Sequence, residues 1–149
     1  MPRQQIIARS GLASRGWASR LPVTAAEQEE FERATWLDRA YPELDPPELP
    51  AAIIEGFCSL SLIDALQRSA FRVDPEEAYG FNYGLERTRF PSPMFVGDRI
   101  IAGFDVTDVS PRGDGFLVTT HCELRVESAE RPGLVTDWLT LILPRHEEA

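Results

Sequence analysis

The sequence predicts an α+β fold in which one antiparallel β-sheet wraps around a single long helix. Its 149 residues are 43% hydrophobic, which suffices for one domain with its own core. Apolar residues recur three or four apart over residues 56–70, the spacing of a buried helix face. The second half of the chain reads as consecutive strands, and short turns favour antiparallel neighbours.

The domain is expected to span residues 21–144, after a mobile N-terminal arm of residues 1–20 and before a C-terminal tail of residues 145–149. The first 26 residues carry four arginines and no acid. Such a start can also be read as a transit peptide, but it lacks a sustained amphipathic pattern. We therefore favour an arm on a cytoplasmic protein.

Two helices are predicted in the first half. Thr24 and Glu27 have the spacing of a capping box, which predicts a short helix over residues 25–37. Four prolines then make residues 41–50 a loop. The long helix should begin at Gly56 and end near residue 70, with one apolar stripe formed by Phe57, Leu60, Ile63, Leu66 and Ala70.

Four strands follow, separated by turns rich in proline and glycine. The third alternates most clearly, with Cys122 and Leu124 on its core face and His121 and Glu123 on its wetter face. The expected strands cover residues 79–90, 99–109, 115–127 and 134–143.

Charge and composition exclude several functions. The net charge of the whole chain is −9. Residues 1–26 contain four arginines and no acidic residue, so the net charge of residues 27–149 is −13. Such a body repels phosphate backbones, so no nucleic-acid partner is expected. All basic residues are arginines, which excludes Schiff-base lysine chemistry and a P-loop lysine. No apolar run approaches the roughly 18 residues of a membrane span, so a soluble chain is expected.

Metal and cofactor signatures are also missing. Cys58 and Cys122 lie in separate apolar runs, which favours free thiols in a reducing compartment over a disulfide. Neither zinc-like spacing nor an EF-hand, a G-x-S-x-G elbow or a G-x-G-x-x-G fingerprint occurs. We expect no metal and no cofactor.

Two ordered segments carry a resemblance to a known family. Residues 53–62, I-I-E-G-F-C-S-L-S-L, resemble the run I-A-H-G-F-L-T-L-S-L that opens the central helix of NodN-like proteins. Residues 81–98, F-N-Y-G-L-E-R-T-R-F-P-S-P-M-F-V-G-D, are similar to the family's I-N-Y-G-L-x-x-V-R-F-P-x-P-V-x-V-G-S. With a weaker match over residues 34–45, the chain resembles MaoC and NodN-like dehydratases over roughly residues 15–143. The resemblance implies a hotdog fold.

The resemblance also implies a catalytic dyad, an Asp and a His five residues later, that moves protons between an acyl thioester and water. Here Asp38 takes the Asp position and Glu43 stands where the histidine would be. Glu55 likewise replaces the histidine before the helix-opening glycine. His121 is placed in mid-strand and His146 in the tail, so neither restores the motif.

Carboxylates could still do the chemistry. A partly desolvated carboxylate near another one holds a proton more tightly, so Glu43 beside Asp38 or Glu55 could act as a base in a coupled set. The first amides of a helix at Gly56 could polarise a thioester carbonyl. The alternatives are a solvated acidic loop for Asp38 and Glu43, and a glycine that only permits a tight turn.

Five further residues are candidates for contact with the substrate. Ser61 matches a family serine on the central helix, and Asn82 and Tyr83 could line the acyl pocket. Arg87 and Arg89 project from one strand face and could contact coenzyme A phosphates or a carrier's phosphopantetheine. Packing support for Ser61, a core position for Tyr83 and plain solvation for Arg87 are the alternatives.

The expected function is an acyl-thioester dehydratase or hydratase, a hydro-lyase acting on coenzyme A or acyl-carrier-protein thioesters. Isomerisation, cyclisation or epimerisation in a biosynthetic pathway would need the same polarised carbonyl and one base. The alternative is a catalytically silent hotdog subunit that binds acyl thioesters or pairs with an active partner. The resemblance further implies a homodimer.

Overall fold

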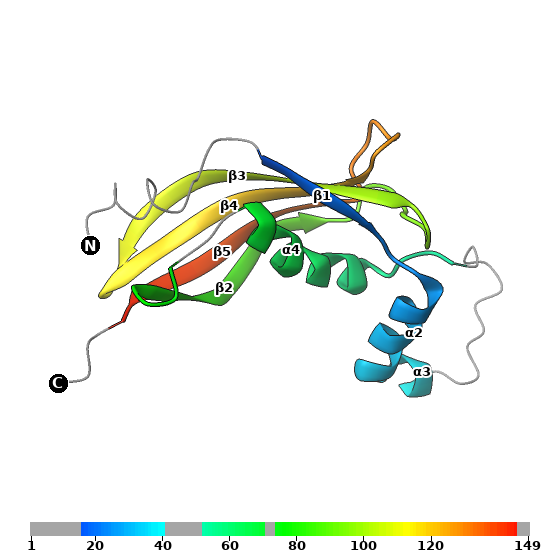
Figure 1. Cartoon of the computed structure of the whole chain (residues 1–149), viewed down its shortest axis with the longest axis horizontal. Coiled ribbons are helices and arrows are strands. Elements are labelled where there is room, and N and C mark those ends of the chain that lie inside the picture. Colours follow the sequence, from blue (N-terminus) through cyan, green and yellow to red (C-terminus); the bar gives the residue numbers. More distant parts are fainter. Residues whose placement is uncertain (1–15, 41–51, 71–73, 146–149) are drawn as a thin grey trace.

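A curved five-stranded antiparallel sheet with one long helix across its concave face forms the body of the protein (Figure 1). The structure is a computed structural model and describes residues 16–40, 52–70 and 74–145. The strand order is β1-β3-β4-β5-β2, so β1 and β2 form the two edges. The elements are β1 (Gly16–Pro22), α2 (Ala25–Ala34), α3 (Leu37–Ala40), α4 (Gly56–Ala70), β2 (Ala78–Arg89), β3 (Arg99–Arg112), β4 (Gly115–Val126) and β5 (Leu134–Pro144).

The first strand was not expected, and assigning residues 16–20 to a mobile arm is wrong. β1 pairs antiparallel with β3, with Gly16 opposite Phe104 and Leu21 opposite Ile100. Its register shifts between Ala18 and Leu21, so the alternation that marks a strand is broken. Backbone pairing with the edge of β3 orders this short segment. Residues 1–15 of the predicted arm lie outside the described residues.

The first helix is capped as predicted but ends earlier. Thr24 Oγ1 accepts a hydrogen bond from the Glu27 amide at 3.2 Å, and a Glu27 carboxylate oxygen accepts one from the Thr24 amide at 2.8 Å. Trp36 then adopts a left-handed φ of 64°, which interrupts the helix. The chain restarts as the short helix α3, which carries Asp38.

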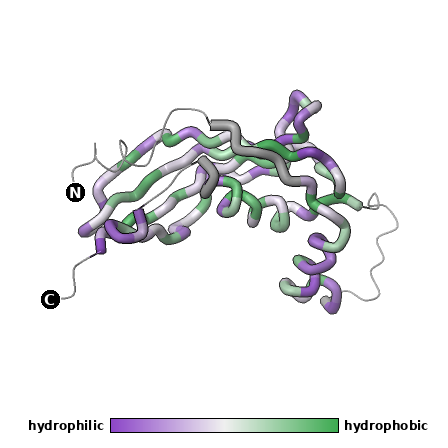
Figure 2. The backbone as a smooth tube through the Cα atoms, viewed as in Figure 1, coloured by the Kyte–Doolittle hydropathy of each residue, from purple (hydrophilic) through white to green (hydrophobic). Residues whose placement is uncertain are grey.

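The core lies between α4 and the concave face of the sheet. Cys58, Ile63 and Leu66 of α4 are buried in one cluster with Cys122 and Leu124 of β4. The predicted alternation of β4 is confirmed, because residues 118, 120, 122 and 124 are buried while their neighbours are more exposed. Figure 2 shows hydrophobic residues along α4 and along the strands. Both cysteines are free and buried, as predicted.

The helix leaves one side of the sheet open. α4 lies mainly against β1 and β3, while β2 forms the opposite edge. Large apolar side chains are exposed on and around that edge strand, namely Phe57, Tyr79, Phe81, Tyr83, Leu85 and Phe90. Among the described residues, no helix is long and apolar enough to cross a membrane.

Candidate active site

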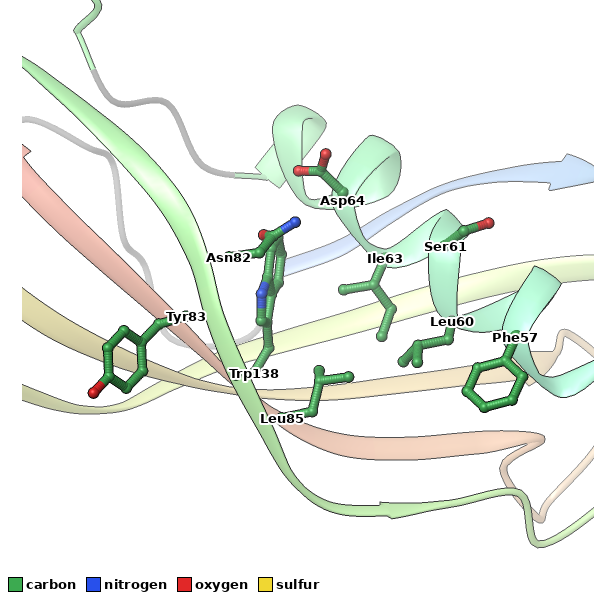
Figure 3. Close-up of a pocket in the computed structure, with 10 residues that line it drawn as sticks. Phe57, Leu60, Ser61, Ile63, Asp64, Asn82, Tyr83, Leu85 and Trp138 are labelled. Atoms are coloured by element: carbon green, nitrogen blue, oxygen red, sulfur yellow. The ribbon is translucent and has the colours of Figure 1, made fainter. Parts of the chain in front are cut away.

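A cavity of about 550 Å³ lies between α4 and the edge strand β2 (Figure 3). This volume falls within the range of small-molecule sites, and most of the wall is apolar, as such sites usually are. The lining residues are Phe57, Leu60, Ser61, Ile63 and Asp64 from α4, Asn82, Tyr83, Gly84 and Leu85 from β2, and Trp138 from β5.

The spacing of residues along α4 and β2 explains why both elements line this cavity. Phe57, Ser61 and Asp64 lie four and three residues apart, so they form one stripe on α4 facing β2. On the other wall, Leu85 pairs with Trp138 across β2 and β5. The register shifts between residues 82 and 84, so Tyr83 is an extra residue at a bulge.

Three predicted residues, Ser61, Asn82 and Tyr83, line the cavity. The Ser61 hydroxyl donates to the carbonyl of Cys58 at 2.7 Å, so it combines a structural bond with its place in the wall. Figure 3 shows the Tyr83 ring on the far side of the β2 ribbon from α4. There its hydroxyl contacts the guanidinium of Arg112, which lies 5.1 Å from the ring centroid.

The beginning of α4 is covered by an aromatic ring. A Cβ atom added to Gly56 would lie 3.1 Å from Cε1 and Cζ of Phe90. The absence of a side chain therefore lets the Phe90 ring approach the helix start closely. Phe90 is 46% exposed, so the ring shields the helix end on one side and meets solvent on the other.

Glu55 precedes this helix end and is partly buried. Its carbonyl accepts the first helical hydrogen bond, from the Ser59 amide at 2.9 Å. Burial raises the pKa of Glu55 above its usual value, and the negative charge of Glu32 on α2 raises it further. The carboxyl beside the helix start therefore keeps its proton to a higher pH than a free glutamate does.

Of the two carboxylates predicted to form a catalytic pair, the structure describes only Asp38. Asp38 lies in the first turn of α3, with its side chain 39% exposed and 3.9 Å from Nε of Arg39. It is absent from the lining of the α4–β2 cavity. Glu43 lies outside the described residues. Arg89 is exposed near the end of β2, and the described part of the chain shows no ion pair for it.

Neither thiol is a candidate base. Burial raises the pKa of Cys122 to about 12. Burial also raises the pKa of Cys58, and the charges of Glu55, Glu32 and Glu27 raise it further. Both thiols therefore stay protonated near neutral pH.

A polar network on the convex face of the sheet was missed by sequence reasoning. Asp137 is 4% exposed, and its carboxylate accepts from Nδ1 of His121 at 2.8 Å and from Nε of Arg87 at 2.6 Å. His121 lies on the opposite face from α4, so it cannot reach the cavity. Arg87 is thus a structural partner of Asp137, and solvation alone does not describe it.

Seven of the ten lining residues were not named as site residues from the sequence, and Asp64 and Trp138 are two of them. Asp64 was detectable, because it lies seven residues after Phe57 and three after Ser61 on the same helix stripe. Trp138 gave no such signal, since only the strand order places it beside β2. Within the described ranges, no group of three or more His, Cys, Asp or Glu residues is placed to hold a metal ion.

A sheet curled around one helix, with a mostly apolar cavity beside that helix, defines a single-domain hotdog protein. No family model matches the sequence. The crystal structure of a MaoC-like dehydratase from Rhodospirillum rubrum superimposes with a TM-score of 0.67 at 16% identity, covering 95% of this chain and 98% of that one. This similarity confirms the predicted fold.

Sequence relatives identify the family. A 3-hydroxyacyl-thioester dehydratase Z of Mycobacterium tuberculosis is 30% identical over 128 residues, covering 82% of this chain and 83% of the relative. A nodulation protein N of Rhizobium leguminosarum bv. viciae is 37% identical over 105 residues, or 68% of this chain. The matched part spans 65% of that nodulation protein's length. The chain belongs to the MaoC and NodN-like dehydratase family.

Proposed function

We propose that this protein is a hydratase or dehydratase of acyl thioesters, acting in the cytoplasm on coenzyme A or acyl-carrier-protein substrates. The observation that carries the proposal is the cavity beside α4, whose Phe57 end adjoins the helix start at Gly56. An acyl chain can lie along its apolar wall while the thioester carbonyl meets the free amides of the first helical turn.

In the direction of hydration, a carboxylate takes a proton from water as the water oxygen bonds to the β-carbon. The electron pair of the double bond moves toward the thioester carbonyl, where the helix amides stabilise the enolate. A carboxyl group then delivers a proton to the α-carbon, and water has been added with no other reactant. Dehydration follows the same steps in reverse.

Asp38 and Glu43 are the carboxylates that we propose for these transfers, with Glu55 as a nearby acid. The raised pKa of Glu55 suits proton donation. Asp38 lies outside the cavity wall of its own chain, and its substitution tests the role directly.

A second copy of the chain is proposed as a partner through β2. Its exposed Phe81 and Leu85 lie on an edge strand, and an unpaired apolar edge favours pairing with another strand. Arg89 on the same strand is proposed to contact phosphates of the carrier.

The test is to offer crotonyl and 3-hydroxyacyl thioesters to the pure protein and to its Asp38→Asn and Glu43→Gln variants. Removal of either acid–base group should lower kcat by about 100-fold or more. Glu30→Gln, an exposed change on α2, is the matched control and should retain activity. Turnover that is indifferent to both substitutions would exclude the carboxylate mechanism.

A catalytically silent subunit is the second candidate. Glutamates at positions 43 and 55, where the family pattern has histidines, favour it. Saturable binding of acyl thioesters without turnover of any of them would support this alternative over the enzyme.

A further inference from the structure

The two ends of the cavity differ in polarity. Phe57 and Leu60 lie toward the helix start, whereas Asp64 and Asn82 lie at the other end (Figure 3). Asp64 comes from the helix wall and Asn82 from the strand wall, so polar atoms are presented from both sides. A carboxylate and an amide at the far end are not what an unbranched saturated chain requires.

The distance from the helix start to this polar end sets the length of an acyl chain that would reach it. Asp64 lies eight residues after Gly56, and an α-helix rises 1.5 Å per residue, which gives about 12 Å. An extended chain advances about 3.6 Å for every three bonds, so about 12 Å corresponds to about ten bonds. Because helical side chains tilt toward the N-terminus, the polar atoms lie somewhat nearer than that.

Asp64 is half-buried and Asn82 is exposed, so both side chains hold water that a ligand must displace. A methyl group that reaches it removes water from a carboxylate and an amide without replacing their hydrogen bonds. A hydroxyl group can donate to the Asp64 carboxylate and accept from the Asn82 amide. Asp64 already takes part in an interaction within the chain, and because a carboxylate has about four acceptor positions it can accept from a ligand hydroxyl in addition.

We infer that the acyl group bound in this cavity carries a hydroxyl near its distal end, and that Asp64 and Asn82 select it over a saturated chain of equal length. The inference rests on the proposed function in one respect, since that function sets the thioester at the helix start. The two residues are therefore determinants of substrate specificity.

The test is calorimetric binding of two pantetheine thioesters, ω-hydroxyoctanoyl and nonanoyl. They have equal length and differ only by a terminal hydroxyl in place of a methyl. Both lack the double bond and the 3-hydroxyl, so neither hydration nor dehydration disturbs the measurement. The wild type should bind the hydroxylated thioester about tenfold more tightly, the effect of one net hydrogen bond.

Asn82→Leu and Asp64→Asn should each remove most of this preference. Asp114→Asn, in the exposed turn between β3 and β4, is the matched control and should keep it. Thermal unfolding establishes that each variant is folded.

Equal or tighter binding of the nonanoyl thioester by the wild type would overturn the inference, as would a preference that survives both substitutions. Failure to bind either thioester would also overturn it. A retained preference, with no turnover of any enoyl or 3-hydroxyacyl thioester, would instead refute the proposed enzymatic function and leave the specificity assignment intact.

Discussion

The Asp137 carboxylate lies 2.8 Å from Nδ1 of His121, its direct cross-strand partner on β4. Arg87 completes the network from β2, where it occupies a bulge with a left-handed φ of 51°. The network therefore ties edge strand β2 to β5 and β4 from the convex face. Trp138 and Leu85, on the other face of the same strands, form the cavity wall, so the network holds that wall in register.

Removal of Arg87 should destabilise the fold. Among the described residues, Arg87→Gln leaves the buried Asp137 carboxylate with His121 as its remaining hydrogen-bond partner, and we expect a loss of about 2 kcal/mol in the free energy of unfolding. Urea denaturation measures this loss. Arg89→Gln, two residues along the same strand, is the control and should change stability by less than about 0.5 kcal/mol. Equal effects of the two substitutions would contradict the structural role of Arg87.

Asp137 should also contribute to acid sensitivity. Burial works to raise the pKa of Asp137, but hydrogen bonds from His121 and Arg87 and their charges outweigh it and hold the pKa below its usual value. The stabilisation is therefore present above the unfolded pKa of about 3.9 and is lost as the pH falls through the lower folded pKa. Unfolding free energies measured from pH 6 to pH 2 should fall less steeply for Asp137→Asn than for the wild type. Parallel curves would refute this assignment.

Substitution of Gly56 should separate function from stability. The new Cβ of Gly56→Ala meets the Phe90 ring at 3.1 Å, and because that ring is half exposed it can move aside. We expect stability to change by less than about 1 kcal/mol, since alanine also favours the helix. Turnover by Gly56→Ala should fall because the added methyl group alters the helix start. The double variant Gly56→Ala with Phe90→Leu should regain part of the lost turnover. A large loss of stability in thermal unfolding would show instead that Phe90 is rigidly packed.

The capping box of α2 provides a local test. Thr24→Ala removes both capping hydrogen bonds of the hydroxyl and should cost about 1 kcal/mol in unfolding free energy. Glu30→Gln on the same helix serves as the control. The rate of amide hydrogen exchange should rise in α2 and stay unchanged in β4. A faster rate throughout the sheet would show that α2 is required for the whole fold.

The local parts of the fold were predictable because they depend on neighbouring residues. The spacing from Phe57 to Leu66 sufficed to place α4, and Thr24 with Glu27 sufficed to place the start of α2. The end of α2 at Ala34 was not predictable, since no glycine marks the left-handed backbone that follows at Trp36. β1 was missed because its bulge and short length hide the strand period.

The site was predicted in part for the same reason. Ser61 and Asn82 follow from motif positions on single elements, whereas Trp138 joins the wall only through the strand order. The Asp137 network unites residues up to 50 positions apart, and only the register of three strands brings them together. Interactions that depend on tertiary register leave no local trace in the sequence.

The central claim is that carboxylates, without histidine, carry out hydration. The chain contains two histidines, so His121→Gln with His146→Gln gives a protein that has none. The most direct measurement is the rate at which this double variant hydrates a crotonyl thioester, followed by loss of the conjugated enoyl absorbance. We expect kcat of the double variant to stay within about threefold of the wild type, a change well below the 100-fold effect of losing an acid–base group. Loss of hydration in the folded double variant, or no hydration by the wild type, would contradict the claim.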